Sequence, residues 1–216
     1  MTRKRGKEPL PTFTTERIPV RTPATPATEH VDATAETTSY GRFGMWLFLA
    51  SLSMLFAGCM VGYLVVRLRA PEWPPPGSPT LPPGLWLSTA VLGVLSVVLL
   101  LAQRAAREGR REILTRTLTA SVLLAIAFLG AQVANWMRMV AADNFPQQSL
   151  FTFGFFILTF LHALHVLGGL VPLILVAVRA RRHRYTATGN EGVQLMAMYW
   201  HFLAFVWLTI LAVLSF

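Results

Sequence analysis

Three histidines lie in stretches of the chain that contain no charged side chain. His162 and His165 belong to residues 151–178, and His201 belongs to residues 193–216. Imidazole is a common ligand of metal ions and haem iron, and two residues three positions apart share one face of a helix. A polar cluster that links helices by hydrogen bonds accounts for the same pattern. Because no carboxylate or cysteine accompanies the pair, we favour this structural role for the three histidines over a metal site.

Both stretches are long enough to cross a membrane, and so are three others. A spanning helix requires about 20 predominantly apolar residues. The sequence has 54% hydrophobic and 13% charged residues, too few charges for the surface of a soluble chain of 216 residues. We therefore predict an all-α integral membrane protein, a bundle of five transmembrane helices at about residues 44–66, 86–102, 118–137, 150–178 and 193–216.

Basic residues fall mainly on one side of these predicted spans. Of the 19 Lys and Arg residues, the opposite side receives Arg67, Arg69 and Arg138. Cytoplasmic segments carry an excess of Lys and Arg, so the N-terminus is predicted to be cytoplasmic and the C-terminus external. This distribution also accounts for the net charge of +9 without a nucleic-acid partner.

Residues 1–42 differ in composition from the rest of the chain. They contain repeated Pro and Thr residues, mixed charges and few large apolar side chains. Such a segment cannot bury enough apolar surface to offset its ordering entropy. We expect a disordered cytoplasmic tail over residues 1–42, no cleavable signal peptide, and a membrane domain over residues 43–216.

Small and rigid residues predict two further features. Gly58 and Gly62 form a GxxxG pair, which allows close helix approach either inside the bundle or between copies. The proline-rich link over residues 71–83 predicts a rigid strap, with Trp73 and Trp86 at the level of the lipid headgroups. No Asp or Glu lies in any predicted span, which disfavours a proton-coupled transporter.

The histidine segments resemble those of a known family. The run FLHALHVLGG at residues 160–169 resembles the H-G-L-H-V-x-x-G motif of subunit III of haem-copper terminal oxidases. The run YWHF at residues 199–202, followed by a Val-Trp pair, resembles the family's Y-W-H-F-x-x-x-V-W motif. The segments that begin at Gly44 and Glu72 are similar to its G-M-x-L-F and W-P-P segments. The resemblance covers residues 44–216, and the matching family positions include Trp73, Gly169, Tyr199, Trp200 and Trp207.

Two positions depart from the family pattern. Leu52 follows Ser51 where the family carries the acid of an S-E pair, and Asn135 stands where its Q-x-x-E segment ends in an acid. Neither side chain titrates, so we do not expect the family's proton-uptake role. The chain resembles the five-helix bacterial form of the family, and this resemblance implies that the lipid-holding cleft that longer members form with two additional helices is not expected.

The resemblance implies an accessory subunit III of a bacterial cytochrome c oxidase in the cell (inner) membrane. Such a subunit would support assembly and stability, with no catalytic, cofactor-binding or metal residue of its own. Haem and copper would belong to its partners, catalytic subunit I and subunit II, and membrane lipids, including a bound phospholipid, are compatible ligands. The alternatives are a component of a quinol oxidase or nitric oxide reductase complex, and a stand-alone membrane haem or metal protein.

Overall fold

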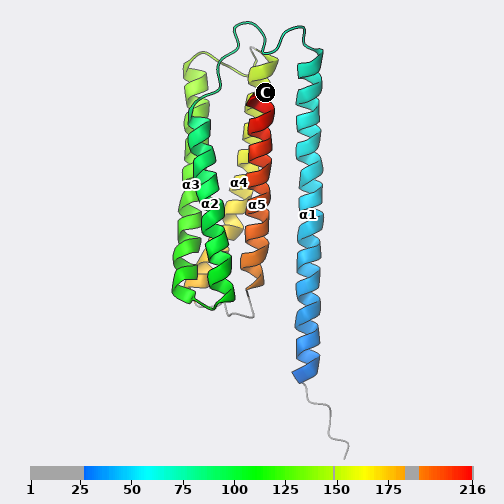
Figure 1. The fold of residues 1–216 in the computed structure, drawn as a ribbon, viewed down its shortest axis with the longest axis vertical. Coiled ribbons are helices and arrows are strands. Elements are labelled where there is room, and N and C mark those ends of the chain that lie inside the picture. Colours follow the sequence, from blue (N-terminus) through cyan, green and yellow to red (C-terminus); the bar gives the residue numbers. More distant parts are fainter. Residues whose placement is uncertain (1–26, 148, 183–189, 216) are drawn as a thin grey trace, which may run out of the picture. The chain divides into compact units, whose positions relative to one another are not determined.

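The computed structural model describes residues 27–147, 149–182 and 190–215, and these residues form five helices (Figure 1). The helices are α1 (Ala27–Arg69), α2 (Gly84–Arg107), α3 (Arg111–Ala141), α4 (Leu150–Arg181) and α5 (Glu191–Ser215). All five contain a segment long and apolar enough to cross a membrane. The predicted all-α, five-helix fold is confirmed. The chain divides into two compact units, residues 1–37 and residues 38–216.

Four of the helices form a closed bundle. α2 packs against α3 and α5, and α4 packs against the same two helices. α1 lies beside this bundle, and none of its Cα atoms comes within 8 Å of a Cα atom in another described helix. It is joined by long side chains instead: the Phe48 and Tyr199 rings lie 6.0 Å apart, and an Arg67 nitrogen donates to the Val213 carbonyl at 3.4 Å. α1 and α5 therefore run side by side, held near both ends.

The observed helices extend beyond the predicted spans. The predicted spans were bounded by the ends of the uncharged stretches. Arginine, glutamine and alanine all favour helix, so a helix continues past the apolar segment. The largest difference is at α1, which begins at Ala27 although residues 27–42 were assigned to the tail. Pro26 precedes this helix and the next proline is Pro71, so nothing interrupts it between them. The expected disorder of residues 1–26 lies outside the described residues.

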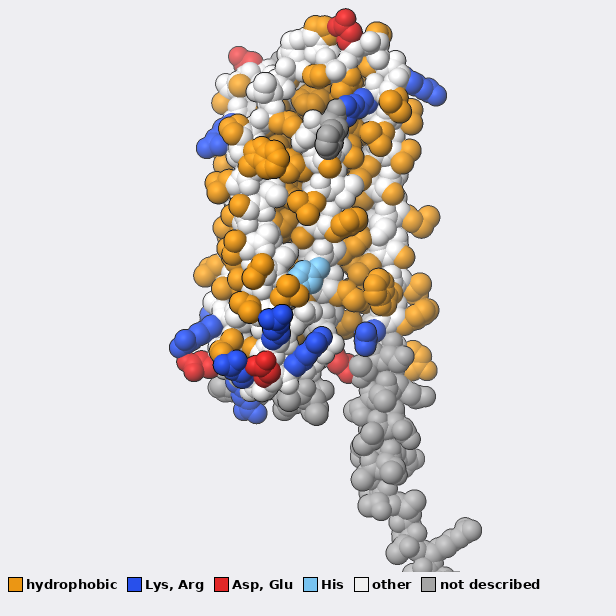
Figure 2. All heavy atoms as spheres, viewed as in Figure 1, with side chains coloured by type: hydrophobic (Ala, Val, Ile, Leu, Met, Phe, Trp, Pro, Cys, Tyr) orange, Lys and Arg blue, Asp and Glu red, His pale blue; other side chains and the backbone are white. Residues whose placement is uncertain are grey.

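The links hold the helix ends in place. Gly109 takes a φ of 68°, which favours glycine, and allows α3 to begin two residues later. The Ser149 side chain caps α4 by accepting a hydrogen bond from the Thr152 backbone N–H at 3.1 Å. Figure 2 shows arginines gathered where α2 meets α3 and where α4 ends, with hydrophobic side chains covering the middle of the molecule. The charged residues thus mark the ends of the spans.

Candidate functional site

His162 lies at the centre of the helix packing. Its side chain is fully buried, and its ring is surrounded by three aromatic rings from three other helices. The centroid distances are 6.2 Å to Phe56 of α1, 5.8 Å to Phe128 of α3 and 5.2 Å to Trp207 of α5. Neither ring nitrogen has a hydrogen-bond partner among the described residues. His162 therefore contributes to the core mainly through ring packing.

His165 lies one turn further along α4 and is half-buried. Its Nδ1 atom is 2.7 Å from the Leu161 carbonyl oxygen, so Nδ1 carries the proton and donates it to that oxygen. Its ring is 5.1 Å from the Phe56 ring. The two α4 histidines thus meet the same α1 side chain, on one face of the helix as predicted.

His201 does not join this pair. It is half-buried on α5, and no hydrogen bond or ring contact with another described residue links it to His162 or His165. In the described part of the chain, no group of three or more His, Cys, Asp and Glu residues could hold a metal ion. Of the three histidines in the expected cluster, His162 and His165 are brought together around Phe56, and a structural link between them and His201 stays a prediction.

Gly169 and Tyr199 form the close contact between α4 and α5. A Cβ atom on Gly169 would overlap the Tyr199 ring, so the ring packs directly on the α4 backbone. The Tyr199 hydroxyl donates to the His165 backbone carbonyl at 2.8 Å. Two positions chosen from sequence motifs are therefore a matched pair, in which the absence of a side chain on one helix accommodates a ring from the other.

The two motif tryptophans of α5 are both buried. Trp207 donates from its indole N–H to the Thr89 hydroxyl of α2 at 2.9 Å, and its ring stands edge-on to Phe128 at 5.3 Å. Trp200 is fully buried, and its indole nitrogen has no hydrogen-bond partner among the described residues. Trp207 thereby connects α5 with both α2 and α3.

Sequence reasoning missed a set of polar contacts between neighbouring helices. Asn135 donates to the Ser88 hydroxyl at 3.3 Å, and the Trp136 indole donates to the Thr159 hydroxyl at 3.0 Å. Gln132 is fully buried, with no partner for its amide among the described residues. The available signal was the spacing of Phe128, Gln132 and Asn135, which places all three on one face of α3.

The positions that depart from the family pattern face the protein interior. Leu52 is 7% exposed and lies on the inner face of α1, close to Leu49 and Phe56 in the sequence. Asn135 is 1% exposed. An acid at either place would therefore be shielded from water and lipid, whereas the residues present carry no charge.

Two other features singled out in the sequence are a glycine pair in α1 and the tryptophans of the strap. A Cβ atom on Gly58 or Gly62 would meet no atom within 4 Å, so this pair does not face another described helix of the chain. A contact between chains stays a prediction. Trp73 turns inward, with centroid distances of 5.5 Å to Tyr63 and 6.0 Å to Phe151, whereas Trp86 is 68% exposed. The Trp73 ring thus lies between the end of α1, which carries Tyr63, and the start of α4, which carries Phe151.

Comparison with known proteins identifies the family. The family model described as cytochrome c oxidase subunit III matches residues 20–216. This chain belongs to that family. The match begins nearer the N-terminus than Gly44, where the sequence resemblance was expected to start, so much of the expected tail is included. The protein is a multi-pass membrane subunit III of the haem-copper oxidases.

Relatives of this subunit III come from different oxidases. It is 32% identical over 172 residues to cytochrome c oxidase subunit 3 of Synechocystis, covering 78% of this chain and 72% of that one. It is 29% identical over 171 residues to cytochrome bo(3) ubiquinol oxidase subunit 3 of Pseudomonas aeruginosa, and the match covers 79% of this chain and 82% of that one. Cytochrome c oxidase subunit 3 of Thermostichus vulcanus is 27% identical to this chain over 191 residues, and the match covers 85% of this chain and 90% of that one.

Proposed function

We propose that this subunit III is an accessory subunit without a redox centre in a bacterial cytochrome c oxidase. It would support assembly and stability of catalytic subunit I, with subunit II in the same complex. The family match over residues 20–216 carries this proposal. The burial of His162 and Trp207 among aromatic rings of neighbouring helices supports it, because their contacts stabilise helix packing. Haem and copper would then belong to the partner subunits.

The proposed topology places the N-terminus and the arginine-rich links in the cytoplasm of a bacterial cell. The strap between α1 and α2 would then face outward. To test this, we would replace Cys59 with alanine and introduce one cysteine at Thr80, which is exposed in the strap, or at Ala187. An impermeant thiol reagent added to intact cells should label the Thr80 position alone. Labelling of the Ala187 position alone would reverse the topology.

A direct role in proton transfer is not part of this proposal. The predicted spans contain no Asp or Glu, and the two family acid positions hold Leu52 and Asn135. A carboxyl group in an apolar setting can hold a proton near neutral pH, whereas these side chains cannot titrate. The subunit would therefore pack against the catalytic subunit without relaying protons through α1.

The decisive experiment is purification from native membranes through a tag on this chain. We expect the haem-containing catalytic subunit I and subunit II to co-purify, and the complex to oxidise ferrocytochrome c with O₂. Recovery of a chain that carries haem or metal by itself would refute the proposal.

The second candidate is a quinol oxidase, which the similarity to the ubiquinol oxidase subunit 3 of Pseudomonas aeruginosa supports. Quinol oxidation without cytochrome c oxidation by the purified complex would favour it. Nitric oxide reduction without O₂ reduction would indicate a nitric oxide reductase complex.

A further inference from the structure

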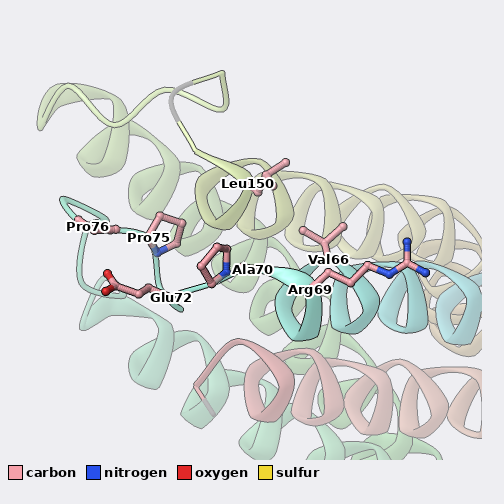
Figure 3. Close-up of a pocket in the computed structure, with 8 residues that line it drawn as sticks. Val66, Arg69, Ala70, Glu72, Pro75, Pro76 and Leu150 are labelled. Atoms are coloured by element: carbon pink, nitrogen blue, oxygen red, sulfur yellow. The ribbon is translucent and has the colours of Figure 1, made fainter.

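Buried polar side chains gather in one half of the helix bundle. This half adjoins the end where α1 ends and α4 begins, here called the strap end, where Figure 3 shows Leu150 and the strap prolines Pro75 and Pro76. Charged residues are exposed there, among them Arg69 and Glu72. Leaving Tyr and Trp aside, the other half of the described chain buries only Ser121 and Asn190, whereas this half buries Ser88, Gln132, Asn135, Thr152, Thr159 and His162.

Two of these residues each bury two polar atoms that have no hydrogen-bond partner. Both amide atoms of Gln132 and both ring nitrogens of His162 are unpartnered among the described residues, and both side chains are fully buried. A buried polar group without a partner costs free energy, and a bilayer interior holds no water that could relieve this cost. The Ser121 hydroxyl, in contrast, donates to the Thr117 carbonyl at 2.9 Å. Gln132 and His162 thus need a partner that the described residues do not supply.

Contacts on either side place Gln132 and His162 at the same level of the bundle. Phe128 lies one turn before Gln132 on α3, and its ring centroid is 5.8 Å from that of His162. Trp136 lies one turn after Gln132, and its indole donates to the Thr159 hydroxyl at 3.0 Å. Thr159 and His162 are one turn apart on α4, which packs against α3. Gln132 therefore lies beside the turn of α4 that runs from Thr159 to His162.

Polar side chains also join this level to the strap end. Asn135, one turn beyond Gln132, donates to the Ser88 hydroxyl of α2 at 3.3 Å. A Cβ atom on Gly84 would overlap the Asn135 side-chain oxygen and lie 3.1 Å from an Arg138 side-chain nitrogen. The exposed Arg138 thus lies close to the buried Asn135. These groups offer hydrogen bonds to a small polar molecule that enters from the strap end.

Water matches the hydrogen-bonding capacity of this site. A neutral imidazole has one donor and one acceptor nitrogen, and a side-chain amide has atoms of both kinds. A molecule that binds both side chains must therefore donate and accept, as water does. Buried waters commonly make about three hydrogen bonds to polar groups that lack other partners. The polar side chains of this half include no carboxylate or thiolate, so a cation would bind without a counter-charge.

We propose that ordered water binds inside the bundle between Gln132 of α3 and His162 of α4. One water would bond to the Gln132 amide and to a His162 ring nitrogen, and further water would follow Asn135 toward the strap end. A phenylalanine at position 162 would fill the same space among the three aromatic rings around it, so the ring nitrogens are what a histidine adds. The inference goes beyond the accessory role proposed above and does not depend on which oxidase contains the chain.

X-ray radiolysis of the tag-purified complex in water labelled with heavy oxygen tests the proposal. Radiolysis converts water bound inside the bundle to hydroxyl radicals, which hydroxylate the nearest reactive side chain. An added scavenger removes the radicals that form in bulk solution. The Phe128 ring is fully buried and lies beside His162, so mass spectrometry should find labelled oxygen on Phe128 in the presence of scavenger. An unmodified Phe128 would overturn the proposal.

Two substitutions on α3 form a matched pair for this experiment. Gln132→Leu replaces the amide with an apolar group of similar size, so the labelling of Phe128 should be lost. Ser121→Ala also removes a fully buried polar group, but its hydroxyl is bonded within its own helix, so Phe128 should be labelled as in the wild type. Equal labelling in Gln132→Leu and Ser121→Ala would contradict the assigned site.

A high-resolution cryo-electron microscopy map of the wild-type complex gives a second readout that requires no substitution. Water density should lie about 2.7–3.2 Å from an amide atom of Gln132 and from a ring nitrogen of His162. A direct hydrogen bond between the two side chains, or the absence of water density between them, would refute the proposal.

Discussion

The contact between Gly169 and Tyr199 gives the sharpest test of how α4 and α5 are held together. Gly169→Ala places a methyl group where the Tyr199 ring now lies. The ring cannot simply turn away, because its hydroxyl is bonded to the His165 carbonyl at 2.8 Å. Overpacking of this kind costs about 1–3 kcal/mol, and loss of the hydroxyl bond would add up to ~1.7 kcal/mol. We therefore expect Gly169→Ala to destabilise the chain by about 1–5 kcal/mol.

The free energy of unfolding can be measured by titrating the purified full-length chain in mild detergent with SDS. Gly58→Ala is the matched control, because a Cβ atom there meets nothing within 4 Å. We expect this control to change the free energy of unfolding by no more than ~0.5 kcal/mol. The two substitutions add the same methyl group to transmembrane helices, so their difference isolates the contact with Tyr199.

A double-mutant cycle then decides whether the ring causes the loss. Tyr199→Leu removes the ring and the hydroxyl, so in this background Gly169→Ala should cost far less than in the wild type. The expected coupling energy is about 0.5–3 kcal/mol. Strictly additive effects would show that Gly169 is needed for some reason other than the Tyr199 ring, and the reasoning would fail.

Three further predictions follow from other contacts. Thr89→Val and Trp207→Phe should each destabilise the chain by about 0.6–1.7 kcal/mol in the same SDS titration, and the double variant should cost less than their sum, because both remove one hydrogen bond. His165→Ala should weaken retention of this subunit in its purified complex and leave the haem and copper content of the other chains unchanged; loss of a metal stoichiometric with this chain would contradict this. Hydrophobic carbodiimide should leave residues 44–66 unlabelled in peptide mass analysis, whereas Leu52→Glu should create a labelled site; labelling of the unmodified segment would show that a group other than a side-chain carboxyl reacts there and would contradict the prediction.

The fold was predictable because a membrane interior tolerates only long apolar helices. The uncharged stretches of the sequence located all five helices, including the short second one, where the observed helix α2 extends to Arg107. The helix ends were less predictable, because an arginine or glutamine that terminates an apolar stretch still favours helix. At the start of α1, residues 27–42 have the composition of a tail and nevertheless continue the helix. The polar composition of these residues indicates that they are not buried in a core, but a segment can be helical without being buried.

The candidate site was predictable in its local pairs and less so across helices. A spacing of three placed His162 and His165 on one face, and both contact Phe56. The position of His201 depended on the rotation of α5, which periodicity alone does not set. Trp207 faces the core beside His162, and among the described residues no hydrogen bond or ring contact joins His201 to His162 or His165. Rotation is determined by contacts such as that of Trp207 with Thr89, which join residues far apart in the sequence.

The packing of α1 explains why its two faces carry such different residues. Inside a membrane there is no hydrophobic force between helices, so association depends on close packing and hydrogen bonds. α1 approaches the bundle through large side chains, with Phe56 reaching both α4 histidines, and its backbone stays distant. Its Gly58 and Gly62 positions are exposed, and at these positions another helix can approach the backbone closely. α1 is thus held to its own chain by ring contacts and the Arg67 hydrogen bond, and a contact of another helix with Gly58 and Gly62 stays a prediction.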